Sequence, residues 1–283
     1  MELPTSSSPS LTTEKVQFCH VAKSHDGSGQ SVGITNKGET YTWGPLNGLG
    51  QLGRVDGPKR QPRPAQFSLS SASSSSSSPS PLTVQAIRGY AGGTADAGHS
   101  AVLDSKHRLW MTGCDRWQQL GLGSSSSGAA GYTWTALWQT SFQYNPFIAQ
   151  LMSRHCSSGN NSNHNGAMIR HVALGGDHTL VLSANQRDVF SFGKGSEGQL
   201  GLANKPFVST PAHAKGLSVQ EGQDKIGALC AIQHCSIALD ETGKILKEAG
   251  KCSGLNSDHT SSSMALAFQA CRESSKRDGL VHF

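Results

Sequence analysis

Cysteine and histidine carry the most specific chemistry that this 283-residue chain could offer. Five of them gather in its C-terminal part: Cys230, His234, Cys235, Cys252 and His259. Thiolate and imidazole are the ligands that zinc prefers in proteins. The spacing matches no established zinc-finger pattern, and the first two also sit at positions of an internal repeat that explains them. The sequence therefore favours no metal here, and we assign no cofactor.

Histidine also recurs at intervals along the chain. His99, His178 and His234 each begin a short apolar segment, whereas the first such segment carries Ser31 at that place. A single catalytic centre does not need one copy per repeat, so we interpret these residues as orienting hydrogen-bonding groups. No phosphate-binding loop, nucleophile elbow or kinase motif is found, and no catalytic residue is assigned.

The seven cysteines are odd in number and irregularly spaced. A chain of this length can build a core without disulfide bonds. We therefore expect reduced thiols and a cytoplasmic or nuclear protein. The N-terminus lacks the features of a secretory signal, and no apolar run approaches the length of a membrane span.

The composition indicates which elements must position these residues. Glycine is abundant, at 33 residues, while only 15% of residues are charged and the net charge is +5. Long helical bundles and charge-driven disordered chains have other compositions. Many short strands joined by tight turns fit this one.

The glycines recur with the strands. Three units each contain an apolar strand, a polar turn, a strand that ends in Gly, and a turn that reads Gly-Gln-Leu-Gly or a variant of it. A side chain at the strand-ending glycines would collide with the next unit or require a positive φ. The expected structural glycines are Gly44, Gly53, Gly113, Gly121, Gly193 and Gly201. A fourth unit starts at 231–239 and then loses the pattern.

These repeats resemble those of the regulator of chromosome condensation family of β-propellers. Residues 175–182, 189–193 and 198–201 look like one full family repeat, and 41–44 with 50–53 come close. The second unit departs, with Thr112 in place of an aromatic residue and Gln118 in place of Gly. The resemblance implies an all-β propeller with blades of four antiparallel strands.

About four blades are recognisable, so the propeller is open, truncated or half of an oligomeric ring. We expect a leader at 1–15, a propeller domain at 16–252 with insertions at 65–82 and 124–166, and a degenerate segment at 253–283. The family includes exchange factors for the Ran GTPase. A protein-interaction scaffold is thus the expected function, and nucleotide exchange on a small GTPase is the alternative, although no exchange wedge can be matched.

Two segments could bind a partner protein. Asp115, Arg116 and Trp117 occupy the turn after Gly113. The aromatic segment 132–152 contains Trp134 and Trp138, which would serve either as interface anchors or as buried residues of an irregular blade. We interpret the basic patch of Lys59, Arg60 and Arg63 as part of a solvated loop. Without a long basic tail, the sequence disfavours nucleic acid and chromatin as partners.

Overall fold

The computed structural model describes residues 16–24, 29–54, 61–67, 84–123, 138–155, 168–252 and 269. For 61–67 and 155 it describes the backbone alone. The predicted leader at 1–15, Trp134, His259 and nearly all of 253–283 lie outside these ranges, as do Lys59 and Arg60.

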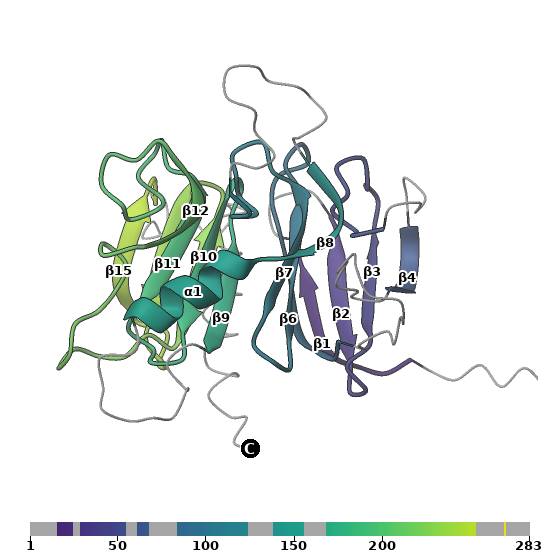
Figure 1. The fold of residues 1–283 in the computed structure, drawn as a ribbon, viewed down its shortest axis with the longest axis horizontal. Helices are drawn as coiled ribbons and strands as arrows, with labels where there is room; N and C mark the ends of the chain where they lie inside the picture. Colours follow the sequence, from purple (N-terminus) through teal and green to yellow (C-terminus); the bar gives the residue numbers. More distant parts are fainter. Residues whose placement is uncertain are drawn as a thin grey trace, which may run out of the picture.

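Four antiparallel sheets make up the described fold, and we name them blades 1 to 4 (Figure 1). Each is a meander in which consecutive strands pair. Blade 1 comprises β1 (Phe18–Lys23), β2 (Ser31–Thr35), β3 (Thr40–Gly44) and β4 (Gln61–Phe67), and blade 2 comprises β5 (Ala86–Gly92), β6 (His99–Asp104), β7 (Leu109–Cys114) and β8 (Trp138–Tyr144). Blade 3 comprises β9 (Ile169–Leu174), β10 (His178–Ser183), β11 (Val189–Lys194) and β12 (Phe207–His213), and blade 4 comprises β13 (Ala228–Ile232), β14 (Cys235–Leu239) and β15 (Ile245–Gly250).

The blades follow one another through their first strands. β1 lies against β5, β5 against β9, and β9 against β13. Figure 1 shows blades 1 and 2 beside blades 3 and 4 in the order of the chain. Within the described residues the series is an arc that does not close into a ring. This confirms the predicted all-β architecture with about four propeller blades, left incomplete.

Apolar side chains fill the space between successive blades. β6 and β10 are buried along their whole length on both faces. Val102 and Trp110 of blade 2 pack against blade 1, whereas Leu103 and Met111 belong to the cluster shared with blade 3. Alternate side chains of these strands therefore pack against two different neighbouring blades, so that neither face of the strand is exposed to solvent.

The segment expected to be an insertion at 124–166 contains regular structure. Residues 138–144 form β8, the outer strand of blade 2, and helix α1 (Pro146–His155) packs against β12. Asn145 caps the helix, because its Oδ1 accepts hydrogen bonds from the backbone N–H groups of Phe147 and Ile148. Ile148 and Met152 then bury the helix face in the core between blades 2 and 3. The helical residues of the described chain include no stretch with the length and hydrophobicity that a bilayer crossing requires.

Candidate interaction site

Side-chain hydroxyl groups join each blade to the one before it. A Ser or Thr at the second position of the second strand donates a hydrogen bond to the backbone carbonyl of the Gln in the preceding blade's turn. The pairs are Ser100 with Gln51 at 2.8 Å, Thr179 with Gln119 at 2.8 Å, and Ser236 with Gln199 at 2.7 Å. This contact lies in the same place at all three joints of the arc.

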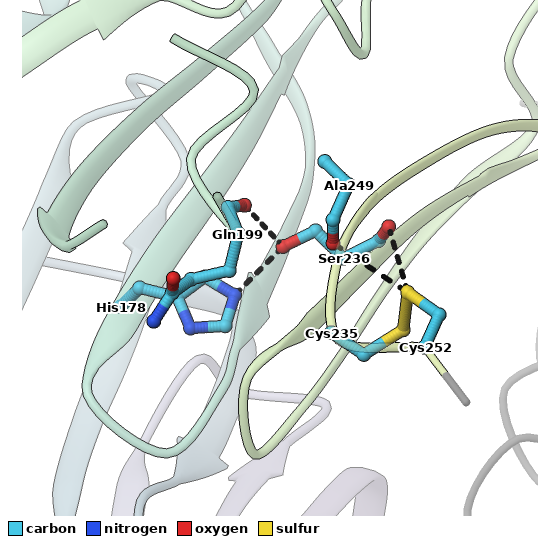
Figure 2. The surroundings of a disulfide bond; sticks show 6 residues. All are labelled: His178, Gln199, Cys235, Ser236, Ala249 and Cys252. Atoms are coloured by element: carbon cyan, nitrogen blue, oxygen red, sulfur yellow. Dashed lines mark hydrogen bonds between the residues drawn. A yellow bond between two sulfur atoms is a disulfide. The ribbon is translucent and has the colours of Figure 1, made fainter. Parts of the chain in front are cut away.

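The residue just before that hydroxyl points forward, to the following blade. His178 Nε2 lies 2.8 Å from Ser236 Oγ, as Figure 2 shows. Since the Ser236 hydroxyl donates to Gln199, the His178 ring donates its Nε2–H to Ser236. His99 makes the looser equivalent, 3.4 Å from Thr179 Oγ1. Burial lowers the pKa of His178 to about 3 and that of His99 to about 4, so both rings are neutral.

The strand register corrects two of the predicted repeat positions. His99 pairs with Gly113, His178 with Gly193, and Cys235 with Gly250. Cys235, not His234, therefore occupies the histidine position in blade 4, and His234 stands one residue earlier. In blade 1 the equivalent residue is Gln30, not Ser31. Its Nε2 donates to the carbonyls of Gly92 and His99 in blade 2.

Several of the repeat glycines lie in close contacts or have a positive φ. A Cβ at Gly113 would lie 2.4 Å from the carbonyl oxygen of Gly98, and one at Gly193 would lie 2.6 Å from that of Asp177. Both glycines also have φ above 100°. Gly53 and Gly121 instead face an aromatic ring of the following blade, at 2.2 and 2.6 Å. The sequence reasoning missed Gly250, which ends β15 with φ 90°. Its signal was its position at the end of the strand that follows the Asp240–Gly243 turn.

The cysteines differ from the expectation of reduced thiols. Cys235 and Cys252 form a disulfide bond, and Cys230 is also disulfide-bonded. Cys19 and Cys114 are free thiols. Among the described residues, no group of three His, Cys, Asp or Glu side chains is placed to hold a metal ion. The Cys235–Cys252 bond joins the first residue of β14 to the residue two beyond the end of β15.

Blade 3 contains a Ser, a His and an Asp in mutual contact, and their geometry does not support nucleophilic catalysis. Asp188 Oδ1 and Ser218 Oγ lie 2.9 and 3.2 Å from the same atom, His213 Nε2. A catalytic histidine must bond the acid through one ring nitrogen and the nucleophile through the other. The Ser218 hydroxyl also donates to the Ala214 carbonyl. These residues tie the loop after β12 to β11.

The turn after Gly113 divides the predicted partner-binding residues into buried and exposed ones. Asp115 is fully buried, and its Oδ1 accepts a hydrogen bond from Leu120 N at 2.9 Å. Asn47 does the same for Leu52 in blade 1. Burial raises the pKa of Asp115 to about 7.

Arg116 and Trp117 are exposed on the turn face of the arc. Lys194 of blade 3 lies 5.0 Å from the centre of the Trp117 ring, within the range of a cation–π contact. Lys194 Nζ is also 3.8 Å from Asp177 Oδ2. On the same face, Lys251 Nζ lies 2.6 Å from Glu197 Oε2. The Trp117 indole is therefore exposed, and it contacts Lys194 of the neighbouring blade.

The two tryptophans of the aromatic segment have different outcomes. Trp138 is half-buried and pairs with Cys114 across β7 and β8, next to the Asp115 turn. Trp134 lies outside the described residues. The structure thus brings Trp138 to the same blade edge as the turn, where it belongs to the outer strand of the sheet.

Comparisons with known proteins agree with this architecture. A family model described as the regulator of chromosome condensation (RCC1) repeat matches residues 169–199. The chain is an RCC1-like β-propeller protein. It is 30% identical to the Protein RCC2 homolog of Danio rerio over 224 residues, which cover 77% of this chain and 39% of the relative. It spans about two-fifths of the length of the curated RCC2 relatives that it matches.

Solved structures support the RCC1-like fold. Human WBSCR16 matches with a TM-score of 0.56 and 19% identity, over 82% of this chain and 49% of that one. Prp20p from Saccharomyces cerevisiae matches with a TM-score of 0.51 and 18% identity, over 83% of this chain and 46% of that one. At these identities the likeness concerns the fold alone.

Proposed function

We propose that this RCC1-like chain is a non-enzymatic protein-binding module. Its contact face is the turn surface of blades 2 and 3, centred on Trp117. An RCC1-like propeller supports a protein-interaction or regulatory role. The observation that carries the proposal is the exposed Trp117 ring, held beside Lys194 of the next blade. Indole rings anchored in this way are enriched among residues that dominate binding energy.

The charges around Trp117 point to the chemistry of the partner surface. Arg116 precedes the indole in the chain, Lys194 lies over it, and Lys251 lies farther along the same face with 70% of its side chain exposed. Asp177 and Glu197 each form an ion pair with one of these lysines. We therefore expect Arg116, next to the indole, to contact an acidic group of the partner, with association that weakens as salt increases.

A small GTPase is the partner class that we place first. The structure of Prp20p was described together with its binding to Gsp1p and histones. Histones are basic and do not complement this face. Nucleotide exchange on such a GTPase is the second candidate function, and the likeness in fold to Prp20p is what favours it.

Binding of the chain to a purified Ran-type GTPase, in nucleotide-free and GDP-bound forms, tests both functions. Trp117→Ala should weaken affinity at least tenfold, because an interface indole contributes about 2 kcal/mol or more. Leu46→Ala is the matched control: Leu46 has the same exposure, 37% against 36%, in the equivalent turn of blade 1. It should change affinity less than threefold.

The outcomes separate the candidates. Binding without faster release of a fluorescent guanine nucleotide supports the scaffold, and acceleration by stoichiometric chain supports exchange. Equal losses in the two variants would remove Trp117 from the contact. If the GTPase does not bind, the proposed face has no support from the GTPase partner of its structural relative.

A further inference from the structure

We propose that Cys252 is a site of reversible thiol–disulfide exchange. At this site a small thiol such as glutathione opens the Cys235–Cys252 bond and releases the end of blade 4 from blade 3. The proposal does not depend on the protein-binding function. It rests on the position of the bond, the unequal exposure of its two cysteines, and the contacts of the segment that it holds.

The disulfide joins a blade-joint position to the segment that leaves the last described strand. Cys235 is the first residue of β14, and Cys252 follows β15 by two residues. Figure 2 shows the bond beside the His178–Ser236–Gln199 group that links blades 3 and 4. Cys235 occupies the place from which Gln30, His99 and His178 contact the next blade. In blade 4 this forward contact is replaced by a covalent bond within the blade.

Only one of the two sulfur atoms is open to attack. Cys235 is fully buried, whereas Cys252 is half-buried. Exchange requires a thiolate to approach a disulfide sulfur, so access selects Cys252 Sγ. The attacking thiolate forms a mixed disulfide with Cys252 as the bond to Cys235 breaks, and Cys235 leaves as a thiolate that takes up a proton.

A second small-thiol molecule completes the reduction. Its thiolate attacks the small-molecule sulfur of the mixed disulfide, which releases an oxidised thiol dimer and the Cys252 thiolate. In total two small thiols are oxidised and the protein gains two S–H groups. Cys252 Sγ lies 3.5 Å from the Ala249 carbonyl oxygen and 3.9 Å from that of Ser236, so a reduced thiol has acceptors where it stands. The reduced Cys252 thiol therefore has acceptors close to its position in the disulfide, which favours its return when the bond forms again.

The segment held by the bond contacts the turn of blade 3. Lys251 Nζ forms an ion pair with Glu197, and Lys251 N donates to the His234 carbonyl at 3.0 Å. Gly250 packs so closely that a Cβ there would lie 2.9 Å from Gln199 Cα. Glu197 and Gln199 both belong to the Gly-Gln-Leu-Gly turn region of blade 3. Opening the disulfide thus loosens the side of blade 4 that covers this turn.

Glutathione titration of the full chain, purified without reductant, tests the proposal. The Cys19→Ser variant is used so that this exposed free thiol does not react. Differential alkylation and peptide mapping should find glutathione on Cys252 at intermediate buffers and free thiols on both cysteines at reducing ones. Cys230, which is also disulfide-bonded, is mapped in its own peptide.

Hydrogen exchange measures the consequence for blade 4. The amides of Lys251 and Cys252 and of the Gln199 turn should exchange at least tenfold faster after reduction, while those of β10 stay protected. The melting temperature should fall by about 5–10 °C, as expected when a loop of this size loses its cross-link.

Variants separate exchange from a purely structural bond. Cys252→Ser should show the fast amides without glutathione and no further response to it, whereas the buried free-thiol control Cys114→Ser should respond as the parent does. If Cys252→Ser does not fold, the titration of the parent still decides the matter. A cross-link that survives until the chain unfolds would overturn the proposal, as would two free thiols in the unreduced protein.

Discussion

Blade 3 and blade 4 share one half of the repeat and differ in the other. Both have a hydroxyl that donates backward to the preceding turn, Thr179 in one and Ser236 in the other. Both end the third strand in a glycine with positive φ. Blade 3 adds a forward-pointing histidine and a Gly-Gln-Leu-Gly turn, whereas blade 4 has Cys235 and a disulfide in their place.

The comparison shows which residues need a neighbour. In both blades the hydroxyl donates to a carbonyl of the preceding blade, which is present in each case, and so Ser236 keeps this hydrogen bond. A forward histidine needs an acceptor on the next blade, and a buried polar ring without one destabilises the fold. Cys235 avoids that cost, because it bonds within its own blade. Within the described residues, the backward hydroxyl is thus kept in blades 2, 3 and 4, whereas the forward position changes in blade 4.

The largest effect should come from breaking the glycine that both blades share. Gly193→Ala adds a Cβ that would lie 2.6 Å from the Asp177 carbonyl oxygen at a residue with φ 102°. We expect a loss of about 4 kcal/mol in the free energy of unfolding, since backbone strain and a backbone clash add. Denaturant unfolding of the two proteins measures this.

Gly222→Ala is the matched control for that substitution. Gly222 also has positive φ, at 87°, but no atom lies within 4 Å of the position of its Cβ. Strain alone should lower stability there by about 1 kcal/mol. Equal losses at the two glycines would show that the close approach of strand and turn contributes nothing.

The strands and glycines could be predicted because their physical requirements are local. An apolar run with alternating side chains and a glycine at its end mark β10 and β11 without knowledge of what they pack against. The fourth strand of blade 2 was left open between an interface segment and part of an irregular blade, for the opposite reason. Residues 138–144 have no turn motif of their own, and they become a strand by pairing with β7.

The joint residues needed the register, which the sequence does not provide. His234 looks like the equivalent of His178, and only the pairing of Cys235 with Gly250 moves the position by one residue. Aligning the hydroxyls of Ser31, Ser100, Thr179 and Ser236 would have found it. The sequence also could not predict which turn residues are exposed. Asp115 and Trp117 are two residues apart, yet Asp115 is fully buried and Trp117 is exposed.

The forward histidine of blade 3 can be replaced by its counterpart from blade 1. His178→Gln should lower the free energy of unfolding by about 2 kcal/mol at pH 7, because Gln fits the ring's space poorly and loses the bond to Ser236. The folded pKa of His178, about 3, lies below the ordinary 6.5. Its contribution is therefore present above pH 6.5 and is lost as pH falls toward 3.

Unfolding curves from pH 8 to pH 4 check this sign. The stability of the parent relative to His178→Gln should fall by about 3 kcal/mol across that range, so that the variant becomes the more stable protein at pH 4. His99→Gln, at the looser joint with a 3.4 Å contact, should cost less at pH 7. A pH-independent difference would mean that the His178 ring titrates in the folded protein as it does in the unfolded one.

Asp115 gives an effect of the opposite sign. Its folded pKa, about 7, is raised from 3.8, so the folded state holds a proton that the unfolded state has lost. Stability from this group is present at low pH and falls as pH rises from about 4 to 7. Asp115→Asn removes the buried charge and keeps the acceptor that Leu120 N needs, as Asn47 does in blade 1. From pH 4 to pH 8 the stability of the variant relative to the parent should rise by about 3 kcal/mol, because only the parent titrates and its pKa shift sets this change. If Asp115→Asn is instead destabilising at pH 8, the carboxylate is stabilised in blade 2, and the two turns differ more than their shared hydrogen bond indicates.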